Sequence, residues 1–276
     1  MNQDFISNDP RRTTNEMEQH IAMLTRSLFA KNRELESLNF ELKTFTTIVT
    51  NEYIETLRHL YTSLEYVISN DAKNLSDTGK ANVRRAQAAI QKMKLLTDDI
   101  VAFSKITTNG NLSLVDLNEI LSNVLLSLAN KIAENRVKIN YNCLPVINGY
   151  PTLLSVLFSH LIDNAIKFKK EEIEPQVTIT HSQQDGIDIK NDHALKDIRY
   201  DVISVMDNGI GFDPKDADKI FTMFYKLGEK GKNKGSGIGL AICKKIMDLH
   251  GGFIVAECIP ECTIFRCFFP SAKFHY

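Results

Sequence analysis

Apolar residues recur every seven positions in the first part of the chain. One series starts at Ile21, and a second lies three residues after it with Lys31 as its one misfit. Four consecutive heptads with polar residues between them predict a coiled-coil seam, and no Gly or Pro separates it from the next helix. The alternative, a single amphipathic helix on a globular domain, is disfavoured by the narrow seam. The series are Ile21, Leu28, Leu35, Leu42 and Val49, and Leu24, Leu38 and Phe45.

A second helical pattern follows a polar turn. The residues Asn, Asp, Ser and Gly cluster at 69–80, and an apolar stripe at three- and four-residue steps occupies 80–106. Two long helices joined by a short turn predict a helical hairpin, and two hairpins in a homodimer make a four-helix bundle. We therefore expect a flexible N-terminus over 1–20, a coiled-coil linker over 21–48 and the hairpin over 45–106.

The pattern changes after residues 107–111, TTNGN, to helices and β-rich runs. Asp116 can cap a helix from Leu117 to about Glu134, and Pro151 suits the first turn of a helix. Several strands follow one another directly, which predicts an α/β sandwich over 113–276 and not an alternating βαβ array. The strands are expected at 137–142, 144–149, 176–183, 200–207, 252–258 and 263–269.

Composition narrows the functional classes. The chain has 276 residues, 43% hydrophobic and 24% charged, which suffices for a real core. A net charge of −1 gives no electrostatic footprint for nucleic acid. The five cysteines lack paired spacing, so neither a disulfide framework nor a zinc site is indicated. Because no signal peptide or membrane span is evident, we expect a cytoplasmic protein.

Three stretches of the second domain carry chemistry. In HLIDNAIKF (160–168), Asn164 and Lys167 share a helix face, where they suit Mg²⁺ and phosphate. In VMDNGIGF (205–212), Asp207 ends a strand and can accept a hydrogen bond from an exocyclic amine. GSGIGLAICKKI (235–246) is a glycine-rich helix entry whose free amides suit phosphate oxygens. Each motif alone is weak evidence for function, because Asn and Lys occur on any solvated helix and a glycine-rich turn can begin an ordinary helix.

Their order is specific. NAIKF, DNGIGF, IFTMFYKL and GSGIGLA resemble the N, G1, F and G2 boxes of the ATP-binding domain of sensor histidine kinases, and the preceding hairpin resembles their dimerisation and phosphotransfer domain. The resemblance covers the chain from about residue 35 to its end. It implies ATP and Mg²⁺ as cofactors, a homodimer formed through the coil and bundle, and a response regulator or a heterodimeric kinase as partner.

The resemblance also implies roles for individual residues. Asn164 would hold Mg²⁺ on the phosphates, Lys167 would touch phosphate, and Asp207 would recognise the adenine amine. Residues 226–234 would form a mobile lid, although a merely solvated loop explains its lysines equally well. Among the remaining positions, Gly209 and Gly211 would line the purine, Gly235, Gly237 and Gly239 would form the hinge of the lid, and Leu240 would start the helix beneath it.

The phosphoacceptor of the family is a histidine followed by an acid, and here the aligned residues are Asn51 and Glu52. The heptad places Asn51 two residues beyond Val49, toward solvent. The lone pair of a carboxamide nitrogen is delocalised into the carbonyl, so Asn51 is a very poor nucleophile. Thr56 replaces a proline that commonly loosens this helix in the family.

The sequence leaves three hypotheses for the function of this protein. The first is an ATP-binding member of the family that has lost autophosphorylation at Asn51 and acts as a dimeric signalling partner, with phosphatase or scaffold action on a response regulator left open. The second is an active kinase that uses His59 or the histidine of a heterodimer partner. The third is a gyrase-, mismatch-repair- or anti-sigma-like protein, which the long hairpin disfavours.

Overall fold

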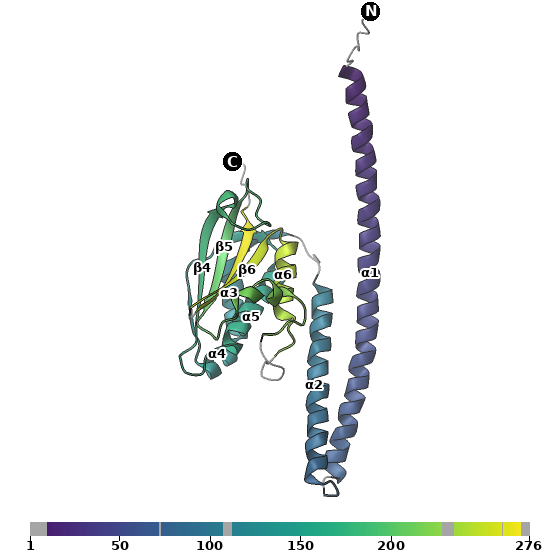
Figure 1. The fold of residues 1–276 in the computed structure, drawn as a ribbon, viewed down its shortest axis with the longest axis vertical. Helices are drawn as coiled ribbons and strands as arrows, with labels where there is room; N and C mark the ends of the chain where they lie inside the picture. Colours follow the sequence, from purple (N-terminus) through teal and green to yellow (C-terminus); the bar gives the residue numbers. More distant parts are fainter. Residues whose placement is uncertain (1–9, 72, 107–111, 228–234, 261, 272–276) are drawn as a thin grey trace, which may run out of the picture.

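The N-terminal part of the chain is a hairpin of two long helices. The computed structural model describes residues 10–71, 73–106, 112–227, 235–260 and 262–271. Helix α1 (Pro10–Asp71) is long, and α2 (Asp77–Lys105) lies alongside its C-terminal half (Figure 1). The hydroxyl of Ser76 caps α2 by accepting a hydrogen bond from the Gly79 N–H at 3.1 Å. The predicted two-helix hairpin is therefore present.

Most described apolar side chains of α1 and α2 are exposed or only partly buried. Leu57 is the only buried residue among the described side chains of α1 and α2. The heptad residues Ile21, Leu24 and Leu28 are each more than half exposed on the single chain. Two helices alone have too little contact area to bury both stripes, so this surface is available to a further helical partner.

Helix α1 begins at Pro10, so residues 10–20 are helical, whereas the sequence analysis expected a flexible N-terminus over 1–20. A polar composition removes burial as a driving force but does not remove helix propensity, and the helix extends N-terminally from the heptads. Among the described helices, none is both long enough and apolar enough to cross a membrane.

The second part of the chain is built on a five-stranded sheet of order β2-β4-β5-β7-β6. The pair β2 and β4 is parallel, and the other three pairs are antiparallel. A small antiparallel sheet of β1 (Ser113–Asp116) and β3 (Val146–Gly149) stands beside it. The strands of the main sheet are β2 (Lys138–Tyr141), β4 (Gln176–Asp185), β5 (Arg199–Asp207), β6 (Phe253–Ile259) and β7 (Cys262–Pro270).

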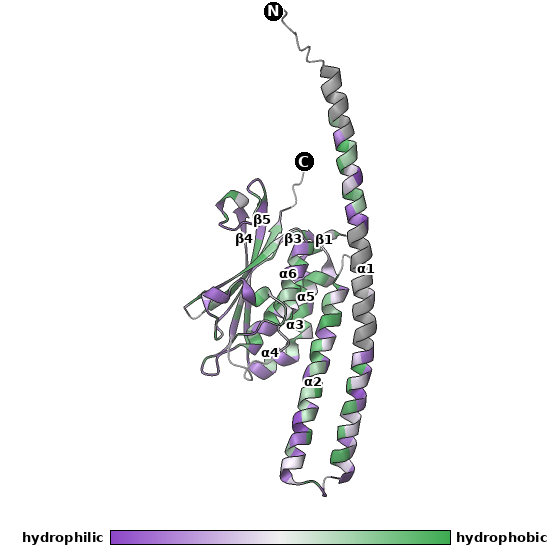
Figure 2. Ribbon diagram, turned by 45° about the vertical axis from the view of Figure 1, so that its right-hand side comes forward, coloured by the Kyte–Doolittle hydropathy of each residue, from purple (hydrophilic) through white to green (hydrophobic). Residues whose placement is uncertain are grey.

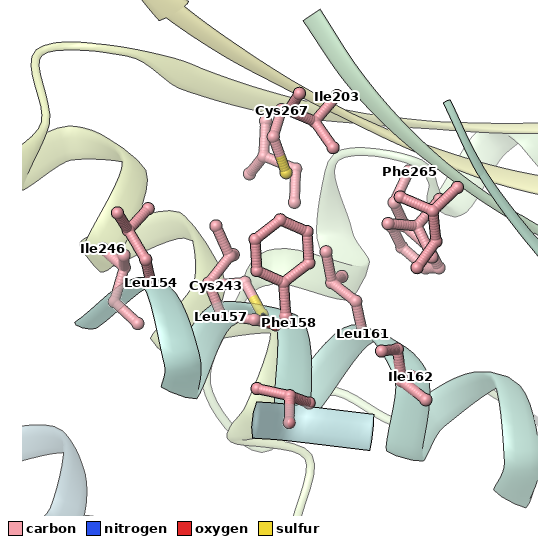
Figure 3. Packing of buried hydrophobic residues seen from close by; sticks show 14 of the residues in the cluster. Leu154, Leu157, Phe158, Leu161, Ile162, Ile203, Cys243, Ile246, Phe265 and Cys267 are labelled. Atoms are coloured by element: carbon pink, nitrogen blue, oxygen red, sulfur yellow. Dashed lines mark hydrogen bonds between the residues drawn. The ribbon is translucent and has the colours of Figure 1, made fainter. Parts of the chain in front are cut away.

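Helices cover one face of this sheet and form the main core with it. Figure 3 shows Leu157, Phe158 and Leu161 of α5 directed at the sheet, where Ile203 and Cys267 meet them. Pro151 occupies the first turn of α5, as predicted, because its missing N–H is not needed there. The helices are α3 (Leu117–Ser127), α4 (Ala129–Asn135), α5 (Pro151–Lys167) and α6 (Gly239–Leu249).

The other face of the sheet is partly covered by the connection between β4 and β5, which includes the short helix η1 (Gly186–Asp188). This segment packs Ile189, Ala194 and Ile198 against a small second core. Phe253 and Phe268 stack there with ring centroids 4.4 Å apart. Two more short helices, η2 (Pro214–Asp216) and η3 (Lys219–Phe221), follow β5.

Two local details differ from the prediction. The single helix expected over 117–134 is two helices, α3 and α4, with a break at Leu128. Leu128 is buried, so the chain turns there to keep apolar side chains of both helices in the core. Strand β1 was not predicted, because its four residues pair only with the distant β3. Asp116 does cap α3, since its carboxylate accepts a hydrogen bond from the Asn118 N–H at 2.8 Å.

The fold predicts unequal costs for two identical substitutions. Leu161 in α5 is 1% exposed, and Leu126 in α3 is 75% exposed. Leu161→Ala should destabilise the sandwich domain by about 2–5 kcal/mol because it leaves a cavity, and Leu126→Ala by less than about 0.5 kcal/mol. Urea unfolding followed by circular dichroism measures both, and similar midpoints for the two variants would contradict the assigned core.

Candidate functional site

An apolar cavity of about 80 Å³ lies where β5 ends beside α5 and α6. Asp207, the last residue of β5, lies in its wall and is 8% exposed. Thr263 faces Asp207 across the β5–β7 pairing, and its hydroxyl donates a hydrogen bond to the carboxylate. The remaining walls are mostly apolar and comprise Phe168, Ile210, Gly211, Phe212, Ile220, Leu227, Leu240 and Phe265, together with Asn164. The cavity thus offers a flat apolar molecule one buried hydrogen-bond acceptor.

The turn after Asp207 requires glycine. The Gly209 N–H donates to Asp207 Oδ1 at 2.9 Å, and a Cβ at Gly209 would lie 2.5 Å from the Phe168 carbonyl oxygen. Gly211 has φ +70°, and a Cβ there would lie 2.8 Å from Cys258 Sγ. Both glycines therefore let the backbone pass close to its neighbours at the cavity.

A second cavity of about 270 Å³ is lined by apolar residues and by charged groups of both signs, the carboxylates of Asp99 and Asp163 and two ammonium groups. Asn164 is one of the residues that border both cavities, so the two are neighbours. Lys167 and Lys226 line the second cavity, and Lys226 Nζ donates a hydrogen bond to the Gly235 carbonyl oxygen. A Cβ at Gly235 would lie 1.9 Å from Lys167 Nζ, so this ammonium group is against the backbone of the glycine-rich turn. Two ammonium groups beside a helix entry suit an anion.

The glycine-rich turn leads directly into α6. Gly237 has φ +83°, a left-handed conformation that favours glycine, and α6 starts at Gly239. A Cβ at Gly239 would lie 3.2 Å from His160 Nδ1, so the start of α6 approaches α5 closely. The N-terminal amides of α6 and the polar face of α5 therefore meet at the second cavity.

The sequence of this chain is similar to those of known proteins. Residues 149–273 match the family described as "Histidine kinase-, DNA gyrase B-, and HSP90-like ATPase". Cyanobacterial phytochrome A of Nostoc sp. is 34% identical over 225 residues, which cover 81% of this chain and 28% of the relative. The methanogenesis regulatory histidine kinase FilI of Methanothrix harundinacea is 25% identical over 235 residues, which cover 81% of this chain and 24% of the relative.

A solved structure of similar fold includes the helical hairpin. It is histidine kinase ThkA in complex with response regulator protein TrrA, with a TM-score of 0.53 and 20% identity over 86% of this chain and 65% of that one. The chain belongs to the sensor histidine kinase family. It spans less than a third of the length of the two curated relatives.

The predicted box residues of this histidine kinase chain converge in the structure. Eight of them line one or both cavities, and the ninth, Gly209, is buried in the turn that follows Asp207. Most of the lid predicted over 226–234 lies outside the described residues. The eight are Asn164, Lys167, Asp207, Gly211, Gly235, Gly237, Gly239 and Leu240.

The predicted phosphoacceptor position is separate from both cavities. Glu52 is exposed on α1 and lines neither of them. Asn51 lies within α1, and its side chain is outside the described residues. Thr56 lies within the continuous helix α1, and its hydroxyl donates a hydrogen bond to the Glu52 carbonyl oxygen at 2.9 Å. Unlike a proline, Thr56 does not force a kink at this position.

Sequence reasoning missed several residues of the site. Thr263 pairs with Asp207 only through the register of β5 and β7. Leu95 and Asp99 come from α2, in the other domain, and still line the charged cavity. Their segment belongs to the apolar stripe predicted over 80–106, and nothing in its sequence indicates a contact with the cavity.

Burial perturbs the titrating groups of the site. It raises the pKa of Asp207, and hydrogen bonds from the Gly209 N–H and the Thr263 hydroxyl only partly oppose this. Burial lowers the pKa of Lys167, and the carboxylates of Asp163 and Asp99 partly oppose the decrease. Burial also lowers the pKa of His160, again against Asp99 and Asp163. The ionised carboxylate of Asp207 therefore destabilises the folded protein when no ligand is bound.

Replacing the carboxylate of Asp207 by a neutral group is therefore predicted to stabilise the fold. Because its folded pKa is raised, ionised Asp207 destabilises the nucleotide-free fold, and the penalty is present at neutral pH and fades as the pH falls through the folded pKa. Asp207→Asn should raise the free energy of unfolding at pH 7, and the gain should shrink in acid. Urea titrations at a series of pH values measure it.

Asp201 on the same strand is the matched control. Burial alone would raise its pKa, but hydrogen bonds from Ser271, Gln183 and His181 together lower it. A lowered pKa means that ionised Asp201 stabilises the fold above the unfolded pKa, so Asp201→Asn should destabilise at pH 7. If both variants lost stability at pH 7, the assigned cost of ionised Asp207 would be wrong.

Proposed function

We propose that this histidine kinase chain binds ATP with Mg²⁺ and acts as a dimeric signalling protein that does not phosphorylate itself at position 51. The observation that carries the proposal is that the two cavities are neighbours. An apolar cavity with one buried acceptor shares wall residues, Asn164 among them, with a cavity that is lined by ammonium groups, carboxylates and the start of α6. This sequence of surfaces matches a purine followed by its phosphates.

The apolar cavity supplies purine recognition. The Asp207 carboxylate accepts a hydrogen bond from the exocyclic amine, which favours adenine over a purine with a carbonyl at that position. Gly211 and the apolar walls contact the ring faces. The hydroxyl of Thr263 and the amide of Gly209 hold the carboxylate in place.

The charged cavity supplies phosphate binding. Lys167 and Lys226 neutralise phosphate oxygens, and the free amides at the start of α6 donate to them. The Asn164 amide oxygen borders this cavity, and an oxygen ligand of this kind together with phosphate oxygens and water fits Mg²⁺. Bound Mg²⁺ would neutralise charge on the phosphates.

Asn51 sets the limit on phosphoryl transfer. A histidine offers a free lone pair on its ring nitrogen, and the adjacent Glu52 could take up its other proton. The carboxamide of Asn51 offers no such lone pair. The nucleotide site is therefore retained in a chain whose position 51 cannot accept phosphate.

The exposed apolar surface of the hairpin supports dimerisation. The heptad residues Ile21, Leu24 and Leu28 of α1 and half-exposed positions on α2 remain uncovered in the single chain. A second hairpin would bury both in a four-helix bundle, and the heptads would continue as a coiled coil. By analogy with ThkA, whose solved complex contains the response regulator protein TrrA, we expect a response regulator as a partner of this chain.

One observation favours the second candidate function, a kinase that uses its own His59. The His59 side chain is 72% exposed, and its Nε2 lies 3.9 Å from Glu55 Oε1. An exposed imidazole beside a carboxylate has the elements of a phosphoacceptor, although it lies about 12 Å along the helix from position 51. Heterodimerisation with a partner that supplies a histidine remains the other route to phosphorylation.

Nucleotide binding tests the proposal directly. We expect calorimetry to show MgATP binding to the wild-type chain, and Asp207→Asn to weaken it by about 10- to 100-fold, as for the loss of a buried charged acceptor. The control Asp201→Asn should leave the affinity unchanged, because Asp201 lines neither cavity. Absence of MgATP binding by the wild type would refute the proposed function.

Restoring the phosphoacceptor tests the role of position 51. With [γ-³²P]ATP, we expect no acid-labile label on the wild type and clear labelling of Asn51→His, because the helix and Glu52 are retained around it. His59→Gln in the wild-type background is the control. Label on the wild type that disappears in His59→Gln would support the second function and contradict the first.

A further inference from the structure

The C-terminal end of α2 is docked on the ATP-binding domain. Ile106, which follows α2, is 7% exposed within the core of that domain, and Ile100 and Phe103 pack against the same core. Lys245 of α6 donates a hydrogen bond to the Phe103 carbonyl oxygen at 3.0 Å and lies 4.3 Å from the centroid of its ring. Figure 2 shows α2 running beside the helical layer of the domain. These contacts fix the last turns of α2 against the domain.

The docked helix presents an acidic residue to the charged cavity. Asp99 precedes Phe103 by four residues and Leu95 precedes it by eight, so all three share one helix face. Asp99 and Leu95 both line the cavity that holds Lys167 and Lys226. The Asp99 carboxylate is close enough to act electrostatically on His160 and Lys167. It thus places a negative charge beside the groups that would bind phosphate.

We propose that Asp99 is a nucleotide-discriminating residue, and that its carboxylate takes the place of the terminal phosphate while α2 is docked. The inference rests on the proposed ATP site and adds its regulation. A triphosphate and a carboxylate in one partly buried cavity repel each other, because the interior screens charge less than water does. Docking of α2 and binding of the third phosphate therefore oppose each other.

This opposition has two consequences. A diphosphate reaches less far into the charged cavity, so ADP tolerates docked α2 better than ATP does. Because coupling between two equilibria is reciprocal, ATP that is disfavoured by docking must in turn loosen the docking of α2. A chain that cannot phosphorylate Asn51 would still respond to whether ATP or ADP is bound, because the bound nucleotide would change the position of α2.

Asp98 provides a matched control. It is the neighbouring residue, carries the same charge on the same helix, is exposed, and does not line the cavity. The variants Asp99→Asn and Asp98→Asn change the net charge equally, and both keep the size of the side chain and the helix. A difference between them reports the position of the carboxylate and not the total charge.

The experiment measures dissociation constants of MgATP, MgADP and AMP by calorimetry for the wild type and both variants. We expect Asp99→Asn to bind MgATP about tenfold more tightly than the wild type, a typical size for coupling between sites. Its affinity for MgADP should change by less than about twofold, and its affinity for AMP not at all. Asp98→Asn should match the wild type with all three.

Hydrogen exchange at α2 gives a second readout. MgATP should accelerate amide exchange over 95–105 in the wild type, and it should cause a smaller change in Asp99→Asn, in which triphosphate and docking are compatible. MgADP should have little effect in either protein. Exchange that MgATP leaves unchanged in the wild type would overturn the proposed opposition.

The remaining outcomes separate this inference from the proposed function. Weaker MgATP binding by Asp99→Asn would overturn it and would assign Asp99 to Mg²⁺ instead. Equal tightening in Asp98→Asn, or equal tightening for ATP and ADP, would overturn it in favour of a general charge effect. In all these cases the wild type still binds MgATP, whereas failure of the wild type to bind any nucleotide would overturn both proposals.

Discussion

The packing of α5 against the sheet is the constraint on which the site depends. Leu157, Phe158 and Leu161 are almost wholly buried on one side of the helix. Asn164 is seven residues, about two turns, beyond Leu157 and therefore lies on the same side of the helix, at the end where the core gives way to the two cavities. Lys167 lies about one turn further on, so a rigid helix holds both an amide oxygen and an ammonium group at the site. A loss of packing in the core would displace the site as well as weaken the fold.

The end of β5 completes the site at a cost to the free protein. Asp207 is carried into an apolar environment by a strand whose neighbouring residues belong in the core, and burial opposes its ionisation. The fold offsets part of this cost with Thr263 and the Gly209 amide. In our proposal the bound ligand offsets the rest of this cost, because an exocyclic amine that donates a hydrogen bond to the carboxylate favours its charged form.

The helical hairpin has two different surfaces. One leaves apolar residues uncovered in the single chain and suits a second hairpin, whereas the C-terminal end of α2 is held on the ATP-binding domain by Ile106 and by the contact of Lys245 with Phe103. A helix that touches both a dimer surface and a nucleotide cavity can couple them without phosphoryl transfer. In our proposal this explains why an ATP site would be kept in a chain with Asn51 at the phosphoacceptor position.

The sequence by itself determined the class of fold, all six strands expected from β-rich runs, and the box residues, because periodicity and glycine-rich turns are local and the order of the boxes is specific. It also led to the prediction that Asn51 cannot accept phosphate, because this prediction depends on the chemistry of one position and needs no coordinates. Only the tertiary structure decided the break at Leu128, the pairing of β1 with β3, and the approach of Thr263 and Asp99 to the site. These features depend on strand register and on the docking of one domain against another, which bring together residues far apart in the chain and leave no pattern in any short segment.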